Sequence, residues 1–558
     1  MTTPTPSIIR GLPLEEENGL GTLTMSGWFA EVCAEHAHRD ALVWYEGDER
    51  VLWTYADLWD RANEVARSLL ALGIGKGTRV GVLMSNRPEF LSAVFGTALA
   101  GGVATTISTF STTPELDHLL KASACSVLLL ERSLLRKDYL DMLCELEPEF
   151  ATPQKPGYRS QHFPYLQHIA VVGESQGAAQ SWPEFLSRGA AVDPQLVDAT
   201  AAQVTPADPG ALFFSSGTTA LPKGILSAHR GVALQLWRWR RFYQTKEDAR
   251  TWSANGFFWS GNFGMAIGGT LTAGGCLVLD PYFDPERALA LMEREKATMA
   301  IAWPHQWPQL EAASNWLDVD LSSMIYVNPN FQLANHPTVT TEWDEPFFAY
   351  GNTETFTISS IFESGTPAER INGSSGEPQP GMVFKIVEPL TGELVPVGQE
   401  GEIAVKGPTL MLGYLGIPLD ETLDDEGYFR TGDGGYVDDE NRLYWKGRLN
   451  DIIKTGGANV SPREIDAALL RMSEIKLSQT VGIPHDTLGE IVVGCVVLHR
   501  GEALDEEALR TRLKAELASY KVPKHILFFD EAELETTGTA KIKTSELKEK
   551  VSARLNML

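Results

Sequence analysis

Helix-like and strand-like segments alternate along much of this 558-residue chain, and this alternation constrains its fold most. Residues 54–73 begin with a capping-box pattern and place apolar side chains every three or four positions, as an amphipathic helix does. The short apolar run 79–84 follows, and the helix pattern of 115–123 precedes a second apolar run at 125–131. Such alternation predicts α/β layers around a largely parallel sheet.

The length and a change of pattern near residue 373 predict more than one domain. Residues 373–445 contain short strand-like runs separated by Gly, Pro and Thr-Gly turns, which is typical of a small β-rich subdomain. Past this segment, Ser461 and Pro462 predict the start of a new helix. We predict an N-terminal domain of residues 1–448 that includes the β-rich subdomain, and a small, mobile α+β C-terminal domain of residues 449–558.

Residues 90–108 are long and poor in charge, which raises the question of membrane insertion. Gly101 and Gly102 interrupt this stretch, and threonines crowd its end. We therefore predict a buried helix, a turn and a strand, and no transmembrane segment. The first residues show no charged start followed by an apolar run, so we expect a cytoplasmic protein without a secretory signal.

The charge balance limits the classes of partner. The chain has 47 Lys and Arg residues against 73 Asp and Glu residues, a formal net charge of −26. Such a field repels nucleic acid and anionic lipid, so we expect neither as a partner. The five cysteines are scattered and show no ligand spacing, which supports neither a disulfide framework nor a zinc site.

One stretch of small polar residues suggests phosphate binding. Residues 213–224 read FFSSGTTALPKG and follow an apolar run. Exposed N–H groups and hydroxyls of such a loop can converge on an anion, and Lys223 supplies a positive charge. The loop is not of the Walker type, because no Gly-Lys-Ser/Thr follows the required spacer. Taken alone, a simple turn explains the composition equally well.

Four further segments accompany this loop: YGNTET at 350–355, GYFRTGDGGYV at 427–437, KGRLNDIIKTGGANVSPREI at 446–465, and ETTGTAKIKTSELK at 535–548. In this order and spacing, the five segments resemble the adenylate-forming superfamily, which includes acyl-CoA synthetases, luciferases and peptide-synthetase adenylation domains. The resemblance runs from about residue 40 to the C-terminus.

The resemblance implies a two-step ligation with ATP, Mg²⁺ and CoA. A carboxylate attacks the α-phosphate of ATP to give an acyl-adenylate and pyrophosphate, and the thiol of CoA then displaces AMP. By their place in the family motifs, Tyr350 lies beside adenine, Thr353 contacts phosphate, and Glu354 binds Mg²⁺. Asp433 holds the ribose hydroxyls with help from Arg448. The residues implied for pyrophosphate are Ser215, Ser216, Gly217, Thr218, Thr219 and Lys223.

The resemblance also assigns roles beyond the β-rich subdomain. Lys541 aligns with the late lysine of the family, which bridges the substrate carboxylate and the α-phosphate and offsets their repulsion. Asn450 stands at the hinge, where the family commonly has Asp or Lys, and asparagine tolerates unusual backbone angles. Gly456 and Gly457 resemble the glycine turn beside the thiol tunnel, where a ligand approaches the backbone.

Aromatic residues mark the expected acid pocket. Family geometry lines this pocket from several segments, and the candidates in them are Trp237, Trp259, Phe263, Phe331 and Phe356. Each residue alone is explained as well by ordinary core packing. Together they indicate a bulky hydrophobic acid.

The resemblance implies that the chain is an AMP-forming acyl-CoA ligase, and we expect a monomer or a homodimer. Ala220 stands where the family has a third glycine, and alanine there costs about 1 to 2 kcal/mol if the position needs a positive φ. This departure leaves open an enzyme with impaired adenylation that only performs the transfer to CoA. An ATP-dependent amide synthetase that uses the same adenylate is a further alternative.

Overall fold

The computed structural model describes residues 5–155, 157–215, 222–345, 348–449, 453–455, 458–485, 488–517, 521–534 and 544–555. The chain forms two compact units. The larger unit consists of Arg10–Val383 and Lys406–Phe429. The other consists of Met1–Ile9, Phe384–Val405 and Arg430–Leu558.

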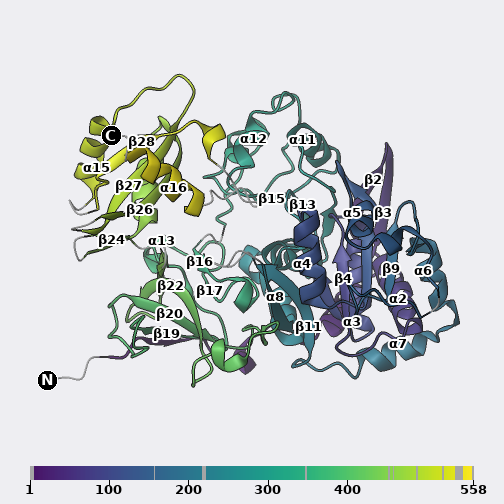
Figure 1. The fold of residues 1–558 in the computed structure, drawn as a ribbon. Coiled ribbons are helices and arrows are strands. Elements are labelled where there is room, and N and C mark those ends of the chain that lie inside the picture. Colours follow the sequence, from purple (N-terminus) through teal and green to yellow (C-terminus); the bar gives the residue numbers. More distant parts are fainter. Residues whose placement is uncertain are drawn as a thin grey trace. The chain divides into compact units, whose positions relative to one another are not determined.

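The first sheet of the larger unit, of which Figure 1 labels β4, β9 and β11, has the strand order β10-β9-β6-β4-β5-β11-β12-β21. All neighbours from β10 to β11 are parallel, whereas β12 and β21 extend the sheet in antiparallel fashion. The predicted, largely parallel sheet is therefore confirmed. Its strands are β4 (Arg79–Leu83), β5 (Val103–Thr106), β6 (Val127–Glu131), β9 (His168–Val172), β10 (Ala179–Ser181), β11 (Pro209–Ser215), β12 (Lys223–Ala228) and β21 (Gly413–Tyr414).

Helices cover both faces of this sheet, and the side chains of β6 show how. Val127 and Leu129 pack with α2 and α3, whereas Leu128 and Leu130 pack with α4 and α5. Because successive strand residues point to opposite faces, an apolar run without alternation is what a sheet covered on both sides requires. The helices of this part are α1 (Met25–Glu35), α2 (Tyr55–Ala71), α3 (Pro88–Leu99), α4 (Thr113–Ser123), α5 (Tyr139–Leu146), α6 (Trp182–Arg188), α7 (Pro194–Ala201) and α8 (His229–Tyr243).

A second sheet shares the central helices, in the order β15-β13-β14-β2-β3. Leu42 and Leu277 pack into the same core as α2 and α3, and Val43 and Val278 pack with α11 on the other face. The elements are β2 (Asp40–Glu46), β3 (Glu49–Thr54), β13 (Arg250–Ser253), β14 (Cys276–Val278), β15 (Met299–Ile301), α9 (Ser260–Asn262), α10 (Gly269–Leu271), α11 (Pro285–Arg294) and α12 (Trp307–Glu311).

Two predicted local structures are confirmed in this unit. The capping box forms at the start of α2, where the side chains of Thr54 and Asp57 each bond to the other's backbone amide. The charge-poor stretch 90–108 becomes the buried helix α3, a turn at Gly101, and β5. No helix among the described residues is long and apolar enough to cross a membrane.

Short strands complete the larger unit. The strands β16, β17 and β18 form a small sheet, and β7 pairs with β8. Their bounds, with one helix, are β7 (Ser133–Leu134), β8 (Lys137–Asp138), β16 (Ala349–Tyr350), β17 (Ser360–Ile361), β18 (Glu377–Pro378) and α13 (Ala368–Ile371).

The other unit contains two sheets. One has the order β1-β19-β20-β22-β23, and it carries most of the predicted β-rich segment. The other has the order β25-β24-β27-β26, with β28 also paired to β27. The elements are β1 (Ile8–Arg10), β19 (Val383–Val387), β20 (Gly401–Lys406), β22 (Phe429–Val437), β23 (Leu443–Arg448), β24 (Ile453–Thr455), β25 (Ala458–Val460), β26 (Ile475–His485), β27 (Gly489–Leu498), β28 (His525–Phe528), α14 (Pro462–Leu470), α15 (Glu506–Glu516) and α16 (Thr544–Leu555).

The predicted start of α14 is confirmed, but its cap differs from the usual one. Ser461 is the N-cap and Pro462 the first helical residue, yet the serine hydroxyl makes no bond to the helix backbone. It donates instead to the carbonyl oxygen of Lys446 at 2.7 Å. The helix buries Ile465 and Leu469, which supplies the apolar contact that its sequence pattern predicts.

Candidate active site

The predicted phosphate loop connects two neighbouring strands. β11 ends at Ser215 and β12 begins at Lys223, and these two residues face each other across the antiparallel pair. The predicted strand before the loop is confirmed. The loop itself lies outside the described residues, and with it Ser216, Gly217, Thr218, Thr219 and Ala220.

Helix α4 holds the backbone where this loop enters β12. His118 Nε2 lies 2.8 Å from the carbonyl oxygen of Pro222, the residue before Lys223. A carbonyl oxygen only accepts, so Nε2 carries the proton and donates. The hydrogen bond fixes the direction in which the chain arrives at Lys223.

Tyr350 is buried at the end of a strand and starts a tight turn. Its carbonyl oxygen accepts a hydrogen bond from the Ser359 amide at 2.8 Å. At Gly351, a Cβ atom would lie 1.8 Å from the carbonyl oxygen of Thr357. No other residue fits this backbone, which explains the glycine after Tyr350.

The next residues form a short helical turn that presents Glu354. Asn352 caps the turn Thr353–Thr355, and its Oδ1 accepts from the Thr355 amide at 3.0 Å. The carbonyl oxygen of Glu354 accepts from the Met411 amide at 2.7 Å. Both bonds fix the backbone, so the half-buried carboxylate of Glu354 leaves the turn from a defined position.

A residue that the sequence analysis did not select joins Lys223 to Glu354. The hydroxyl of Tyr414 donates a hydrogen bond to Glu354 Oε1 at 2.7 Å. Lys223 Nζ lies 5.1 Å from the centre of the Tyr414 ring, within cation–π range. The structure therefore brings two predicted site residues of opposite charge to one tyrosine.

The second compact unit contains the predicted ribose pair. Arg448 Nε lies 3.1 Å from Asp433 Oδ1, and Arg448 Nη1 donates to the carbonyl oxygen of Thr431 at 2.8 Å. Asp433 is buried, whereas the guanidinium is largely exposed. The two residues are register partners on β22 and β23, which explains how residues 15 positions apart meet.

Two of the five predicted pocket aromatics meet in the core of the larger unit. Phe263 and Phe356 are fully buried, and both contact Phe213, with ring centres 5.7 and 5.3 Å away. Their own ring centres are 6.2 Å apart. Phe213 belongs to β11, the strand before the predicted phosphate loop, so Phe263 and Phe356 pack against that strand.

The two tryptophans pack against the same hydrophobic core but make other ring contacts. Trp237 packs its edge against Trp28 and donates from Nε1 to the carbonyl oxygen of Thr22 at 3.1 Å. Trp259 packs against Phe258, with ring centres 5.2 Å apart. Among the described residues, neither tryptophan makes a ring contact with the other three candidates.

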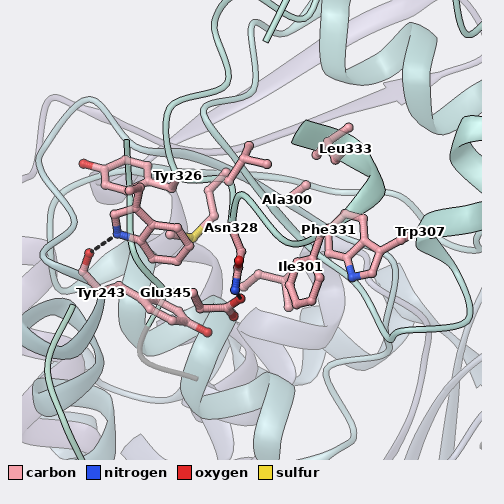
Figure 2. Close-up of a pocket in the computed structure, with 12 residues that line it drawn as sticks. Tyr243, Ala300, Ile301, Trp307, Tyr326, Asn328, Phe331, Leu333 and Glu345 are labelled. Carbon is pink, nitrogen blue, oxygen red and sulfur yellow. Dashed lines mark hydrogen bonds between the residues drawn. The ribbon is translucent and has the colours of Figure 1, made fainter. Parts of the chain in front are cut away.

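Phe331 lies in a separate pocket of the same unit (Figure 2). Its ring stacks on Trp307 with centres 5.2 Å apart. The cavity has a volume of about 10 Å³, which is room for about one water molecule. The other lining residues are Tyr243, Met299, Ala300, Ile301, Tyr326, Val327, Asn328, Leu333, Trp343 and Glu345.

Two polar residues of this pocket, Asn328 and Glu345, lie in Figure 2 between Tyr243 and Tyr326 on one side and Phe331 and Trp307 on the other. Asn328 Nδ2 donates to Glu345 Oε2 at 3.2 Å, and Trp343 Nε1 donates to the carbonyl oxygen of Tyr243 at 3.1 Å. Burial raises the pKa of Glu345 above its usual value. A carboxylate and an amide between aromatic walls can bind a hydroxyl or amino group.

The remaining predicted site residues, Asn450, Gly456, Gly457 and Lys541, lie outside the described residues. Their roles as hinge, thiol tunnel and catalytic lysine stay predictions.

Two family models match successive parts of the chain. The family described as AMP-binding enzyme matches residues 29–415, and the AMP-binding enzyme C-terminal domain matches residues 464–541. The chain belongs to the AMP-binding enzyme family. The predicted membership of the adenylate-forming enzymes is confirmed, and so is an α/β fold with a large N-terminal and a small C-terminal domain.

Relatives of this AMP-binding enzyme cover almost the whole chain. The mitochondrial medium-chain acyl-CoA ligase ACSF2 of Danio rerio is 27% identical over 100% of this chain and 92% of its own length. Feruloyl-CoA synthase of an Amycolatopsis species is 29% identical over 89% of this chain and 93% of its own. The crystal structure of ATP-bound MatB from Rhodopseudomonas palustris is 25% identical, covers 94% of this chain and 98% of its own, and superposes with a TM-score of 0.75.

The side chains of this AMP-binding enzyme fit a magnesium ion that arrives with a nucleotide. No group of three or more His, Cys, Asp or Glu side chains that could hold a metal occurs among the described residues. Mg²⁺ keeps several waters and is usually held by one or two carboxylates together with substrate phosphates. The single half-buried carboxylate of Glu354 suits that mode of binding.

Proposed function

We propose that the protein is an AMP-forming acyl-CoA ligase. The observation that carries the proposal is the contact of both Lys223 and Glu354 with Tyr414, because it gathers a cation for phosphate and a carboxylate for Mg²⁺ in one place. Membership of the AMP-binding enzyme family supports ATP as the nucleotide. Relatives that are named acyl-CoA ligase and feruloyl-CoA synthase support CoA as the acceptor.

In the first step, the acid attacks the α-phosphate of ATP and pyrophosphate leaves. Lys223, with Ser215, Thr353 and the loop residues 216–219, holds the phosphates in place. Glu354 would hold the Mg²⁺ ion, which would supply positive charge to offset that of the phosphate oxygens. Lys541 places a second positive charge between the carboxylate and the α-phosphate, so the two anions can approach each other.

In both steps the adenosine part of the ligand stays bound. Tyr350 lies beside adenine, and Asp433 with Arg448 holds the ribose hydroxyls. Gly456 and Gly457 border the path of the CoA thiol, which displaces AMP from the acyl-adenylate. We assign these steps to a domain of residues 1–448 and a mobile domain of residues 449–558 that pivots at Asn450.

The acid is bulky and hydrophobic in this proposal. Of the five aromatic candidates for the acid pocket, Phe331 lines the pocket of Figure 2 and supports an apolar substrate there, whereas Trp237, Trp259, Phe263 and Phe356 lie outside that pocket. The residues that line this pocket include no Lys, Arg or His to pair with a second carboxylate, so monocarboxylic acids are favoured over dicarboxylic acids. A hydroxyl or amino group on the acid would find hydrogen-bond partners at Glu345 and Asn328.

A substrate screen tests the proposal. Aliphatic and aromatic monocarboxylic acids, with dicarboxylic acids of matched length as controls, are incubated with ATP, Mg²⁺ and CoA. With at least one hydrophobic acid, we expect the enzyme to consume CoA and to release AMP and pyrophosphate. The amounts of CoA consumed, AMP released and pyrophosphate released should be equal. CoA esters should not form from the dicarboxylic acids.

The same screen separates the alternatives. Consumption of CoA from preformed acyl-adenylate, without any pyrophosphate from ATP and free acid, would indicate impaired adenylation. AMP release that requires an amine in place of CoA would indicate an amide synthetase. Either result would contradict an acyl-CoA ligase that performs both steps.

The acid, ATP and CoA are the partners in this proposal, and we infer a cytoplasmic enzyme that acts as a monomer or a homodimer. Size measurement in solution distinguishes the two oligomeric states.

A further inference from the structure

Tyr414 contacts Lys223 and Glu354 at the same time, and all three side chains are half-buried. Partial exposure leaves room for a ligand, while partial burial strengthens interactions between charges. The ring of Tyr414 also packs against Phe429, with centres 6.3 Å apart and planes at 70°. The tyrosine is therefore held by its neighbours and in turn touches two groups of opposite charge.

The backbone around Tyr414 holds the same two elements together. The amides of Leu412 and Leu415 donate to Leu226 and Gly224 on β12, at 2.7 and 2.8 Å. The Met411 amide donates to the carbonyl oxygen of Glu354 at 2.7 Å. Residues 411–415 therefore connect the strand of Lys223 with the turn of Glu354 through main-chain bonds that a side-chain substitution leaves in place.

The hydroxyl and the ring act on different partners. A hydroxyl that donates to a carboxylate makes a charge-assisted bond and restricts rotation of the carboxylate plane. The other oxygen of the Glu354 carboxylate, Oε2, is then held in a defined orientation in which it can bind a cation. The electron-rich face of the ring attracts the Lys223 ammonium without neutralising it, so the ammonium keeps its charge for a phosphate.

We propose that Tyr414 is a positioning residue for the first half-reaction. Its hydroxyl orients Glu354, whose carboxylate would hold the Mg²⁺ that accompanies ATP, and its ring holds Lys223 at the start of β12. The inference rests on the proposed function, because it takes ATP with Mg²⁺ as the ligand of this site. The second half-reaction, in which the acyl group moves from AMP to CoA, involves no pyrophosphate and does not depend on this contact.

The test measures ATP binding by calorimetry, with and without Mg²⁺, in wild type and Tyr414→Phe. Phenylalanine keeps the ring and removes only the hydroxyl. We expect the Mg²⁺-dependent part of ATP affinity to fall about 10-fold or more, as for other groups that orient a metal ligand. ATP affinity without Mg²⁺ should be unchanged, and so should transfer to CoA from preformed acyl-adenylate.

Two further variants separate the hydroxyl from the ring. Glu354→Gln removes the charge that the hydroxyl orients, so Tyr414→Phe should have no added effect in this background. Tyr414→Leu removes the ring as well, and we expect it to weaken ATP binding even without Mg²⁺, because Lys223 loses its contact. If Tyr414→Leu does not fold, the double-mutant cycle of Tyr414→Phe and Glu354→Gln still tests the role of the hydroxyl.

Tyr45→Phe is a matched control, because the Tyr45 hydroxyl also donates to a glutamate, Glu295. It should leave ATP binding unchanged. If ATP affinity in Tyr414→Phe depends on Mg²⁺ as in wild type, or if both half-reactions are lost equally, the role of Tyr414 is wrong. The proposed function would not be affected by either result. Wild-type protein that binds ATP without any effect of Mg²⁺ would overturn the proposed function as well.

Discussion

Asp433 shows at the scale of one residue why a buried charge indicates a site. Its side chain is 4% exposed, and a carboxylate at such a place costs several kcal/mol unless it is paired. Arg448 supplies one partner at Oδ1 from a side chain that is 45% exposed. A ribose offers two neighbouring hydroxyl donors, which suit the two oxygens of a carboxylate. The pair therefore has the chemistry that the proposed ribose site needs.

We predict that Asp433→Ala lowers kcat/KM of both half-reactions about 10- to 100-fold, because charged hydrogen bonds to the ribose are lost in each. Pyrophosphate release and transfer from preformed acyl-adenylate to CoA are measured separately. Asp438→Ala is the matched control, since Asp438 also pairs with an arginine, Arg442, at 2.7 Å. Loss of only one half-reaction in Asp433→Ala would exclude a ribose contact that persists through both steps.

At the scale of elements, α4 and the β11–β12 pair together present the phosphate loop. β12 runs antiparallel to β11, so the loop has to reverse direction between Ser215 and Lys223. The His118 bond to Pro222 holds the residue before β12 against α4. This bond would keep Lys223 in place when phosphates bind at the proposed site.

We predict that His118→Ala raises KM for ATP in the first half-reaction about 2- to 10-fold, which corresponds to the loss of one hydrogen bond. Transfer from preformed acyl-adenylate should be unchanged. His118→Gln can still donate to the carbonyl and should restore part of the affinity. Lys121→Ala, on the same helix and paired with Asp117, is the control. An unchanged KM in His118→Ala would show that this bond does not act on the loop.

Elements with a clear apolar period could be predicted from the sequence, and α2 and α14 start where their caps indicate. The strand β21 could not, because two residues are too few to show a period. Tyr414 acquires its position from the pairing of β21 with β12, nearly 200 residues earlier in the chain. Contacts of this kind depend on the register of distant strands, which local patterns do not encode.

At the scale of the whole molecule, the order of the motifs predicted the family, but the roles of the aromatic residues were not separable by sequence. Phe263 and Phe356 are fully buried, whereas Phe331 lines a pocket. A phenylalanine pattern is the same in a core and in a substrate pocket, because both need apolar surface. Only the packing of the two sheets on the central helices decides which rings are enclosed.

The two proposed half-reactions need different groups, and this leads to a last prediction. Lys541→Ala should lower acyl-adenylate formation about 100- to 1,000-fold, because the lysine charge between the acid and the α-phosphate no longer offsets their repulsion. It should leave most of the transfer from preformed acyl-adenylate to CoA. Gly457→Trp should do the reverse, since an indole at the proposed tunnel blocks the thiol but not ATP. Lys543→Ala, two residues from Lys541, is the control for a change of charge alone. Pyrophosphate release and CoA consumption are assayed side by side, and equal loss of both in either variant would contradict the division of roles.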